Sequence, residues 1–200
     1  MPHGALLYRQ LIVWPWLAWA LYWAVSAARN KTTERRESLG SRLSHVVPLV
    51  VGGVLIGGRS VPWGWLAQRL WPPSPLPYCV GLALVLAGLA FAVWARVHLG
   101  SNWSGTVTVK EGHELIRSGP YAYVRHPIYT GLLAAVLGTA LASATVRAAI
   151  GFVIIAASLV RKLRTEEAFM RDTFPGEYPR YCDEVPALIP FTKARRSAPR

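Results

Sequence analysis

The residues from Pro127 to Val160 read PIYTGLLAAVLGTALASATVRAAIGFVIIAASLV, and Arg147 is the one charged residue among them. A helix that crosses a lipid bilayer needs about 20 apolar residues, or somewhat fewer where the bilayer thins. Because the stretch is longer than one such helix, it predicts two short helices with a hinge near Ser143–Arg147. It also predicts the fold class, an all-α polytopic integral membrane protein.

Three further apolar runs precede this stretch, at about Leu6–Ala28, Leu43–Gly58 and Tyr78–Ala95. They bring the expected number of transmembrane helices to five. We expect a single membrane domain over residues 1–200, in which residues 1–95 supply the amino-terminal helices.

The first apolar run also fits a signal peptide, since Ser26-Ala27-Ala28 is similar to a cleavage site. The length of the run, its tryptophans and Pro15 favour a retained helix. In the second run, Gly53 and Gly57 stand four residues apart, with Gly52 and Gly58 beside them. Such small residues predict a close approach of two helices.

The distribution of charge predicts the topology. Hydrophobic residues make up 52% of the chain and charged residues 16%, with a net charge of +12. Residues 29–42, 96–126 and 161–200, which lie between apolar runs or after the last one, together hold eighteen of the 22 Lys and Arg. This is the pattern of membrane topology and not of a nucleic-acid-binding surface, so no nucleic acid is expected as a partner. By the positive-inside rule these segments face the cytosol, which predicts a bacterial inner membrane protein whose carboxyl terminus is cytosolic.

None of the ten acidic residues lies inside an apolar run. Ion-coupled transporters and proton pumps keep ionisable groups at mid-membrane, so this absence argues against transport. The two cysteines, Cys79 and Cys182, indicate neither a disulfide nor a metal site. Chemistry is therefore expected at the cytosolic boundary, where the polar side chains gather.

One polar cluster lies just before the Pro127–Val160 stretch. His126 precedes a proline and is disfavoured in a helix, while Pro127 suits the first helical position. The amides of the next three residues, Ile128, Tyr129 and Thr130, would be free donors at a positive helix end. With Arg125 and His126 beside them, they predict an anion site at the membrane surface.

A second polar cluster, Arg161-Lys162-Leu163-Arg164-Thr165-Glu166-Glu167, follows the same stretch. If the helix continues, Lys162 and Glu166 share a face. The cluster fits a solvated helix end with charge pairs. It equally fits a carboxylate that holds a cationic ligand beside a guanidinium that holds an anionic one.

Together the two clusters resemble the isoprenylcysteine carboxyl methyltransferase family and its relatives among the membrane phospholipid methyltransferases. The resemblance covers about residues 96–191 and rests on an ordered set of motifs. These are Leu99-Gly100-x-x-Trp103-Ser104, His113-x-Leu115-Ile116-x-x-Gly119-Pro120-Tyr121, Arg125-His126-Pro127-x-Tyr129-x-Gly131, Glu166-Glu167, Tyr178-x-x-Tyr181, Val185-Pro186 and Ile189-Pro190-Phe191.

The resemblance implies a small membrane enzyme that uses S-adenosylmethionine in a cytosolic pocket built from residues 96–200. It implies cofactor contacts by His113, Glu114, Leu115, Ile116, Tyr121, His126, Pro127, Ile128, Tyr129 and Glu166, with Thr108 near a glutamine position of the family. The substrate-binding arginine of the eukaryotic members falls at Lys162, which is a departure. Arg161 or Arg164 would then supply the guanidinium.

Each group of the cofactor has a chemical partner among these residues. Glu166 would pair with its ammonium, the helix end with Arg125 and His126 would hold its carboxylate, and Tyr121 and Tyr129 would face its sulfonium. A carboxylate acceptor needs no general base, whereas an amine or a thiol could use Glu167 or His113.

The expected methyl acceptor is a lipophilic or prenylated molecule with an isoprenylcysteine-like carboxylate. A phospholipid amine and a small thiol stay open as alternatives. A non-enzymatic scaffold or small transporter that binds anionic membrane lipid also stays open. The sequence does not determine the oligomeric state.

Overall fold

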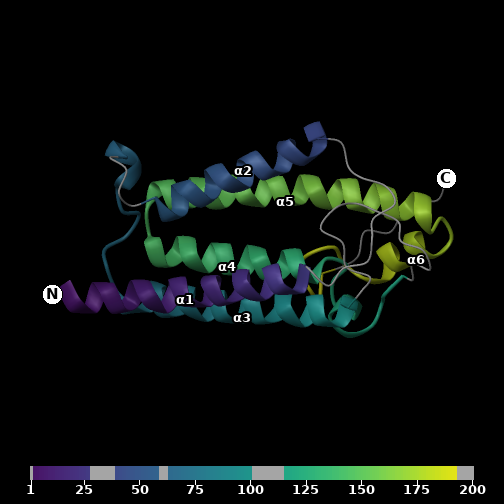
Figure 1. The fold of residues 1–200 in the computed structure, drawn as a ribbon, viewed down its shortest axis with the longest axis horizontal. Helices are drawn as coiled ribbons and strands as arrows, with labels where there is room; N and C mark the ends of the chain where they lie inside the picture. The colour runs from purple at the N-terminus through teal and green to yellow at the C-terminus, as the bar shows by residue number, and fades with distance from the viewer. Residues whose placement is uncertain (1, 28–38, 59–62, 101–114, 193–200) are drawn as a thin grey trace.

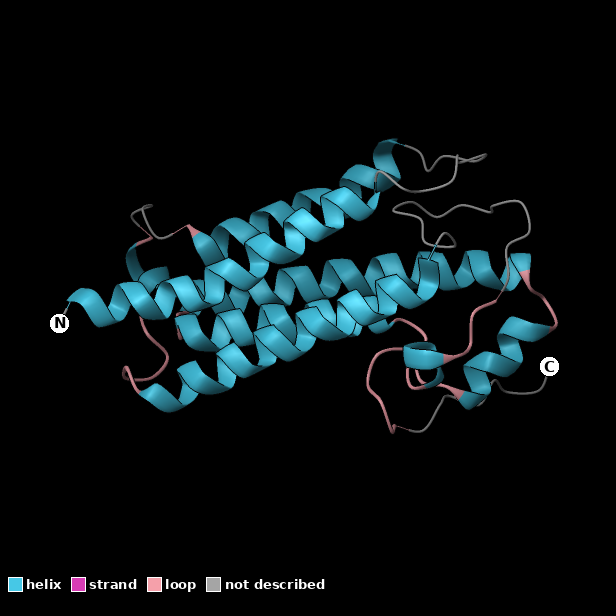
Figure 2. Cartoon of the chain, turned by 60° about the horizontal axis from the view of Figure 1, so that its bottom comes forward, coloured by secondary structure: helices cyan, strands magenta, loops and turns pink. Residues whose placement is uncertain are grey.

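The computed structural model describes residues 2–27, 39–58, 63–100 and 115–192, and this part of the chain consists of helices joined by loops, with one isolated β-bridge between Arg69 and Thr145 (Figures 1 and 2). Its long helices are α1 (Pro2–Ala27), α2 (Leu39–Gly57), α3 (Pro75–Leu99), α4 (Pro127–Ser143) and α5 (Val146–Thr173). Three short helices complete it, η1 (Gly64–Ala67), η3 (Gly119–Ala122) and α6 (Glu177–Glu184). The all-α prediction is confirmed.

The long helices lie side by side in an elongated bundle, with α2 along α5 and with α4 beside α1 and α3 (Figure 1). Within the described residues, α3 alone is both long and apolar enough to cross a membrane. Leu43–Gly57 and Pro127–Ser143 are apolar helical stretches of shorter length.

The predicted hinge between α4 and α5 is confirmed. Ala144 ends α4 in the left-handed conformation, with φ of 53°, and Thr145 is extended. The backbone around the hinge is paired with the segment before α3, since Leu70 N donates to Ala144 O at 2.8 Å and Val146 N donates to Gln68 O at 3.0 Å. The hinge and residues 68–70 therefore form one end of the bundle.

The helix ends that border the basic segments lie at the opposite end. There α1 ends, α2 begins, α3 ends, α4 begins and the polar part of α5 extends (Figure 1). Arg96 in the last turn of α3 ties two of these ends together, because its Nη2 donates to Ser26 O of α1 at 3.0 Å. Five alternating helices thus bring the polar clusters of the sequence to a single end.

Glycines set the contact between α3 and α4. A side chain on Gly88 would overlap the carbonyl oxygen of Gly131, and a side chain on Gly131 would overlap that of Gly88. Gly81 and Gly138 face each other in the same reciprocal way. The glycines stand seven residues apart on each helix, so they recur on one face and let the two antiparallel backbones touch.

Gly88→Ala is therefore expected to destabilise the bundle by about 1–3 kcal/mol, because its methyl group would meet a backbone oxygen that cannot move aside. Thermal unfolding of the purified protein in detergent measures the loss. Gly53→Ala is the matched control, since nothing lies within 4 Å of a side chain at that helical position. Equal melting temperatures for the two variants would contradict the glycine contact.

The predicted close approach of two helices at these small residues is confirmed at Gly52 and is wrong for Gly53 and Gly57. Both glycines face open space, whereas their neighbour Gly52 is buried against α5. A side chain on Gly52 would lie 2.8 Å from the carbonyl oxygen of Gly151, and one on Gly151 would lie 2.7 Å from that of Gly52. The small-residue contact exists, but on the helix face next to the one expected.

Arg147 is buried beside the same pair of helices. Its guanidinium donates to the carbonyl oxygens of Leu55 and Ile56 in the last turn of α2. Carbonyl oxygens in the last turn of a helix generally have no partner within that helix, and a cation is favoured at a helix carboxyl end. The single charge within the apolar stretch thus caps a neighbouring helix.

Candidate functional site

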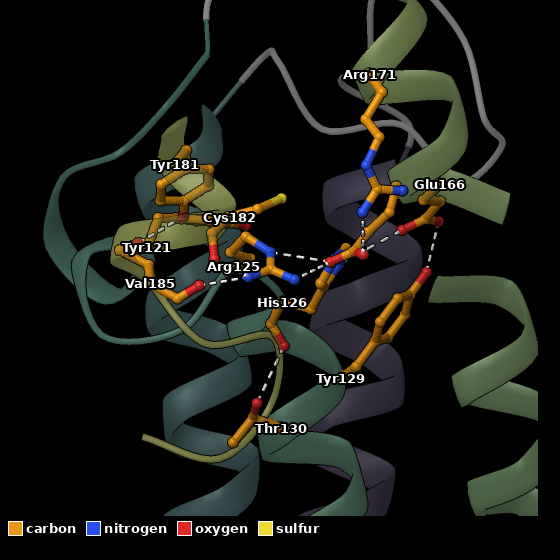
Figure 3. A network of polar contacts seen from close by, with 11 residues as sticks. Tyr121, Arg125, His126, Tyr129, Thr130, Glu166, Arg171, Tyr181, Cys182 and Val185 are labelled. Carbon is orange, nitrogen blue, oxygen red and sulfur yellow. Dashed lines mark hydrogen bonds and ion pairs between the residues drawn. The ribbon is translucent and has the colours of Figure 1, made fainter. Parts of the chain in front are cut away.

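A network of polar side chains lies at the end of the bundle where α4 begins (Figure 3). Arg125, His126 and Tyr129 reach it from the start of α4, and Glu166, Glu167 and Arg171 reach it from α5. The α5 residues belong to the polar part of that helix, beyond its apolar turns. The helix α6 and the segment after it, residues 177–188, contact the network through backbone oxygens and are called the cover below.

Arg125 and Glu167 form the centre of the network. Nε of Arg125 donates to Oε1 of Glu167 at 2.9 Å, and the two side chains are 9% and 10% exposed. Nη1 of Arg125 donates to the carbonyl oxygens of Cys182 and Val185. Burial lowers the pKa of Arg125, but the hydrogen bond and the charge of Glu167 outweigh it and raise that pKa above its usual value. The guanidinium therefore joins α5 to the residues at the end of α6.

Glu167 has two further basic neighbours. Nη2 of Arg171 donates to its Oε2 at 3.2 Å, and Nε2 of His126 lies 3.4 Å from its Oε1. Burial alone would raise the pKa of Glu167, but His126 and Arg125 lower it to about 2. A carboxylate with so low a pKa is a weak base, so the general-base role considered for Glu167 does not fit its surroundings.

The low pKa of Glu167 predicts a loss of stability in acid. Since the folded-state pKa lies below the ordinary value of 4.5, the stability from this group is complete above pH 4.5 and is lost as the pH falls toward 2. The difference in melting temperature between wild type and Glu167→Gln should shrink over this range. A difference that stays constant from pH 6 to pH 3 would contradict the prediction.

The start of α4 differs from the anion site that was predicted there. Pro127 does occupy the first helical position, as expected. However, the Arg125 amide donates to Pro186 O at 2.9 Å, the His126 amide to Ala187 O at 3.0 Å, and the Thr130 amide to His126 O at 3.0 Å.

The hydroxyl of Thr130 at this helix start also has a partner in the protein, because its Oγ1 donates to Leu188 O at 2.7 Å. Backbone oxygens after α6 therefore accept the amides of Arg125 and His126 and the hydroxyl of Thr130, and the guanidinium of Arg125 is equally engaged. The role predicted for the amides of Ile128 and Tyr129 stays a prediction. The expectation that Arg125 and the Thr130 amide hold a ligand's carboxylate does not fit these contacts.

A second part of the network is suited to a cation. The hydroxyl of Tyr129 donates to Oε1 of Glu166 at 2.5 Å, and Nζ of Lys162 lies 3.8 Å from the same oxygen. Lys162 also lies 5.9 Å from the centre of the Tyr129 ring. The ring of His126 stacks on that of Tyr129, with centroids 5.7 Å apart and planes 10° apart. The predicted shared face of Lys162 and Glu166 is confirmed.

His126 lies between the two glutamates. Its Nδ1 is 3.9 Å from Oε2 of Glu166, on the side opposite to Glu167. Its Nε2 is buried and makes no hydrogen bond within the described part of the chain. The imidazole therefore lies between the buried Arg125–Glu167 ion pair and the carboxylate of Glu166. The side chain of Glu166 is 25% exposed.

Aromatic residues hold α6 against the network. The hydroxyl of Tyr181 donates to Tyr121 O at 2.6 Å, and Tyr178, Tyr181 and Cys182 form a buried cluster onto which Leu115 packs. Burial raises the pKa values of Tyr178 and Tyr181 well above their usual range. Tyr121 is 8% exposed and its ring stacks on that of His98, so most of its side chain is enclosed by the protein.

The remaining site predictions divide into two groups. Thr108, His113 and Glu114 lie outside the described residues, while Ile116 and Ile128 are partly buried. Arg161 and Arg164 are exposed on α5. Because successive helix residues are about 100° apart, Arg161 points away from buried Leu163 and Glu167, whereas Arg164 lies only about 60° from Glu167 around the helix.

Two contributors to the site were missed from the sequence. Arg171 lies four residues after Glu167, and that spacing could have indicated an ion pair. Val185 acts through its backbone oxygen, which no side-chain pattern reveals.

Residues 81–172 match the model of the isoprenylcysteine carboxyl methyltransferase (ICMT) family. The chain is 27% identical over 114 residues to protein-S-isoprenylcysteine O-methyltransferase B of Arabidopsis thaliana, across 56% of this chain and 58% of the relative. It is 27% identical over 149 residues to the cobalt-zinc-cadmium resistance protein CzcN of Cupriavidus metallidurans, across 72% of this chain and 60% of the relative.

The fold is also similar to a solved structure, that of the eukaryotic intramembrane Ras methyltransferase ICMT. The TM-score is 0.51 at 22% sequence identity, over 79% of this chain and 55% of that chain. At this identity the match concerns the fold alone. The chain thus spans 55–60% of the length of these relatives.

Proposed function

Residues 81–172 match the isoprenylcysteine carboxyl methyltransferase family, and on this premise we propose that the chain transfers a methyl group from S-adenosylmethionine to a lipophilic acceptor at the membrane surface. The observation that carries the proposal is the cation-binding arrangement of Glu166, Tyr129 and Lys162. The cofactor is a sulfonium with an amino-acid tail, and it supplies an electrophilic methyl group when bound.

The residues of the network fit the cationic groups of this cofactor. The Glu166 carboxylate offers a charge-assisted partner to an ammonium group, and the Tyr129 ring offers its face to a cation. The stacked His126 ring holds Tyr129 in orientation. Neither Arg125 nor Glu167 takes a ligand in this proposal. Their ion pair fixes the cover, which keeps water from the site.

The acceptor we propose is an isoprenylcysteine-like carboxylate. Such a nucleophile is already ionised at neutral pH, so the protein contributes positioning and exclusion of water and needs no general base. The low pKa of Glu167 agrees with chemistry that requires no base from this residue. An acceptor that enters from the bilayer also suits a site at the end of an apolar bundle.

A test of the function uses purified protein, radiolabelled S-adenosylmethionine and three acceptors measured in parallel. These are a prenylcysteine analogue, phosphatidylethanolamine and a small thiol. The CzcN relative, whose name does not mention isoprenylcysteine, is the reason to include the last two. Labelling of the prenylcysteine analogue alone supports the proposal, and labelling of another acceptor alone replaces the substrate. Absence of cofactor binding would favour a scaffold or a transporter.

We also propose that five helices cross the membrane and that the site faces the cytosol. The basic residues next to the site end of the bundle support this orientation. Reporter fusions after Arg200 and after Trp71 are expected to report opposite sides of the membrane, with the carboxyl terminus in the cytosol. Reporters on a shared side would contradict the five-helix topology.

A further inference from the structure

Lys162 already makes the contacts that the proposed function assigns to a ligand's ammonium group. Its Nζ lies 3.8 Å from Oε1 of Glu166 and 5.9 Å from the centre of the Tyr129 ring, and its side chain is 17% exposed. Tyr129 and Lys162 approach the same carboxylate oxygen. The chain's own ammonium group therefore lies where a carboxylate and an aromatic face meet.

The contact between Lys162 and Glu166 differs in kind from the neighbouring one. Arg125 and Glu167 are joined by direct hydrogen bonds and are further fixed by backbone oxygens. The distance of 3.8 Å between Lys162 and Glu166 is an ion-pair distance that is too long for a hydrogen bond. A lysine ammonium is also a point charge on a flexible stem, without the rigid fork of arginine. Of the two pairs, that of Lys162 is the one that can open without disturbing the cover.

We propose that Lys162 is an internal competitor for the cation site of Glu166 and Tyr129, and that a ligand's ammonium group displaces it. The inference rests on the proposed function and goes beyond it, since it assigns the resting occupant of the site. Without ligand, Lys162 neutralises the Glu166 carboxylate. As the product's ammonium group detaches, Lys162 takes its place at Glu166 and opposes its return, which favours release of the product.

Two ligands separate this role from a general effect of charge. S-adenosylhomocysteine carries an ammonium and a carboxylate, so it has no net charge and is little affected by long-range fields. 5′-Methylthioadenosine has the same adenosine part without the amino-acid tail. Only the first ligand should compete with Lys162 for Glu166.

The experiment is titration calorimetry of both ligands on the full-length protein in detergent. Lys162→Met is expected to bind S-adenosylhomocysteine about two- to fivefold tighter, because the ligand no longer has to break the partly exposed ion pair between Lys162 and Glu166. Its affinity for 5′-methylthioadenosine should not change. Arg180→Met, which removes the same charge from an exposed position on α6, should alter neither affinity. Lys162→Gln serves as the second variant if the methionine variant unfolds.

The outcomes are distinguishable. Unchanged or weaker binding of S-adenosylhomocysteine by Lys162→Met and Lys162→Gln would overturn the role of Lys162 and leave the proposed function intact. A wild-type protein that binds neither ligand would overturn both. In a Glu166→Gln background, Lys162→Met should give no gain in affinity. A gain that persists there would show that Lys162 acts elsewhere.

Discussion

Arg125→Ala is expected to lower the free energy of unfolding by about 3–5 kcal/mol, because it leaves the carboxylate of Glu167 buried without its main partner. The variant also removes the donor to the carbonyl oxygens of Cys182 and Val185, which join the end of α6 to the network. We therefore expect both a lower melting temperature and faster proteolytic cleavage around α6. Both can be measured on the purified protein in detergent.

The cover itself provides a matched control. Arg117 and Glu184 also join the cover across a long sequence separation, but their side chains are 40% and 60% exposed. An exposed ion pair contributes about 0–1 kcal/mol, so Arg117→Ala should change the melting temperature little. The double variant Arg125→Met, Glu167→Met should recover part of the loss, because no unpaired charge remains buried. Equal effects of Arg125→Ala and Arg117→Ala would contradict the central role of Arg125.

Glu166→Ala is expected to weaken binding of S-adenosylmethionine about ten- to a hundredfold, the loss of one charge-assisted contact to a partly buried ammonium group. The fold should persist, because Glu166 is less buried than Glu167 and lies outside the Arg125 pair. Titration calorimetry measures the affinity, and thermal unfolding checks that the protein remains folded.

Two further variants serve as comparisons for Glu166→Ala. Tyr129→Phe removes the hydroxyl bonded to Glu166 but keeps the aromatic face, so its loss of affinity should be smaller. Glu177→Ala removes an exposed carboxylate of α6 and should leave the affinity unchanged. If Glu166→Ala binds the cofactor like wild type, Glu166 is not part of the site.

Several features of the fold were readable from the sequence. The apolar stretch from Pro127 to Val160 predicted α4, α5 and the hinge between them, because long apolar runs and their interruptions determine where buried helices begin and end. The shared face of Lys162 and Glu166 followed from helix periodicity alone. Local spacing within one helix is enough for such predictions.

Only the tertiary structure determines which side chains from different helices contact each other. Glu166 and Glu167 are adjacent in sequence, yet helix geometry turns their side chains about 100° apart. Glu166 therefore meets Tyr129, while Glu167 meets Arg125. The contact of Gly52, in place of Gly53, has the same cause. The rotation of a helix about its own axis, which decides the neighbour that each side chain faces, is set by the packing of its whole face. No short motif contains that information.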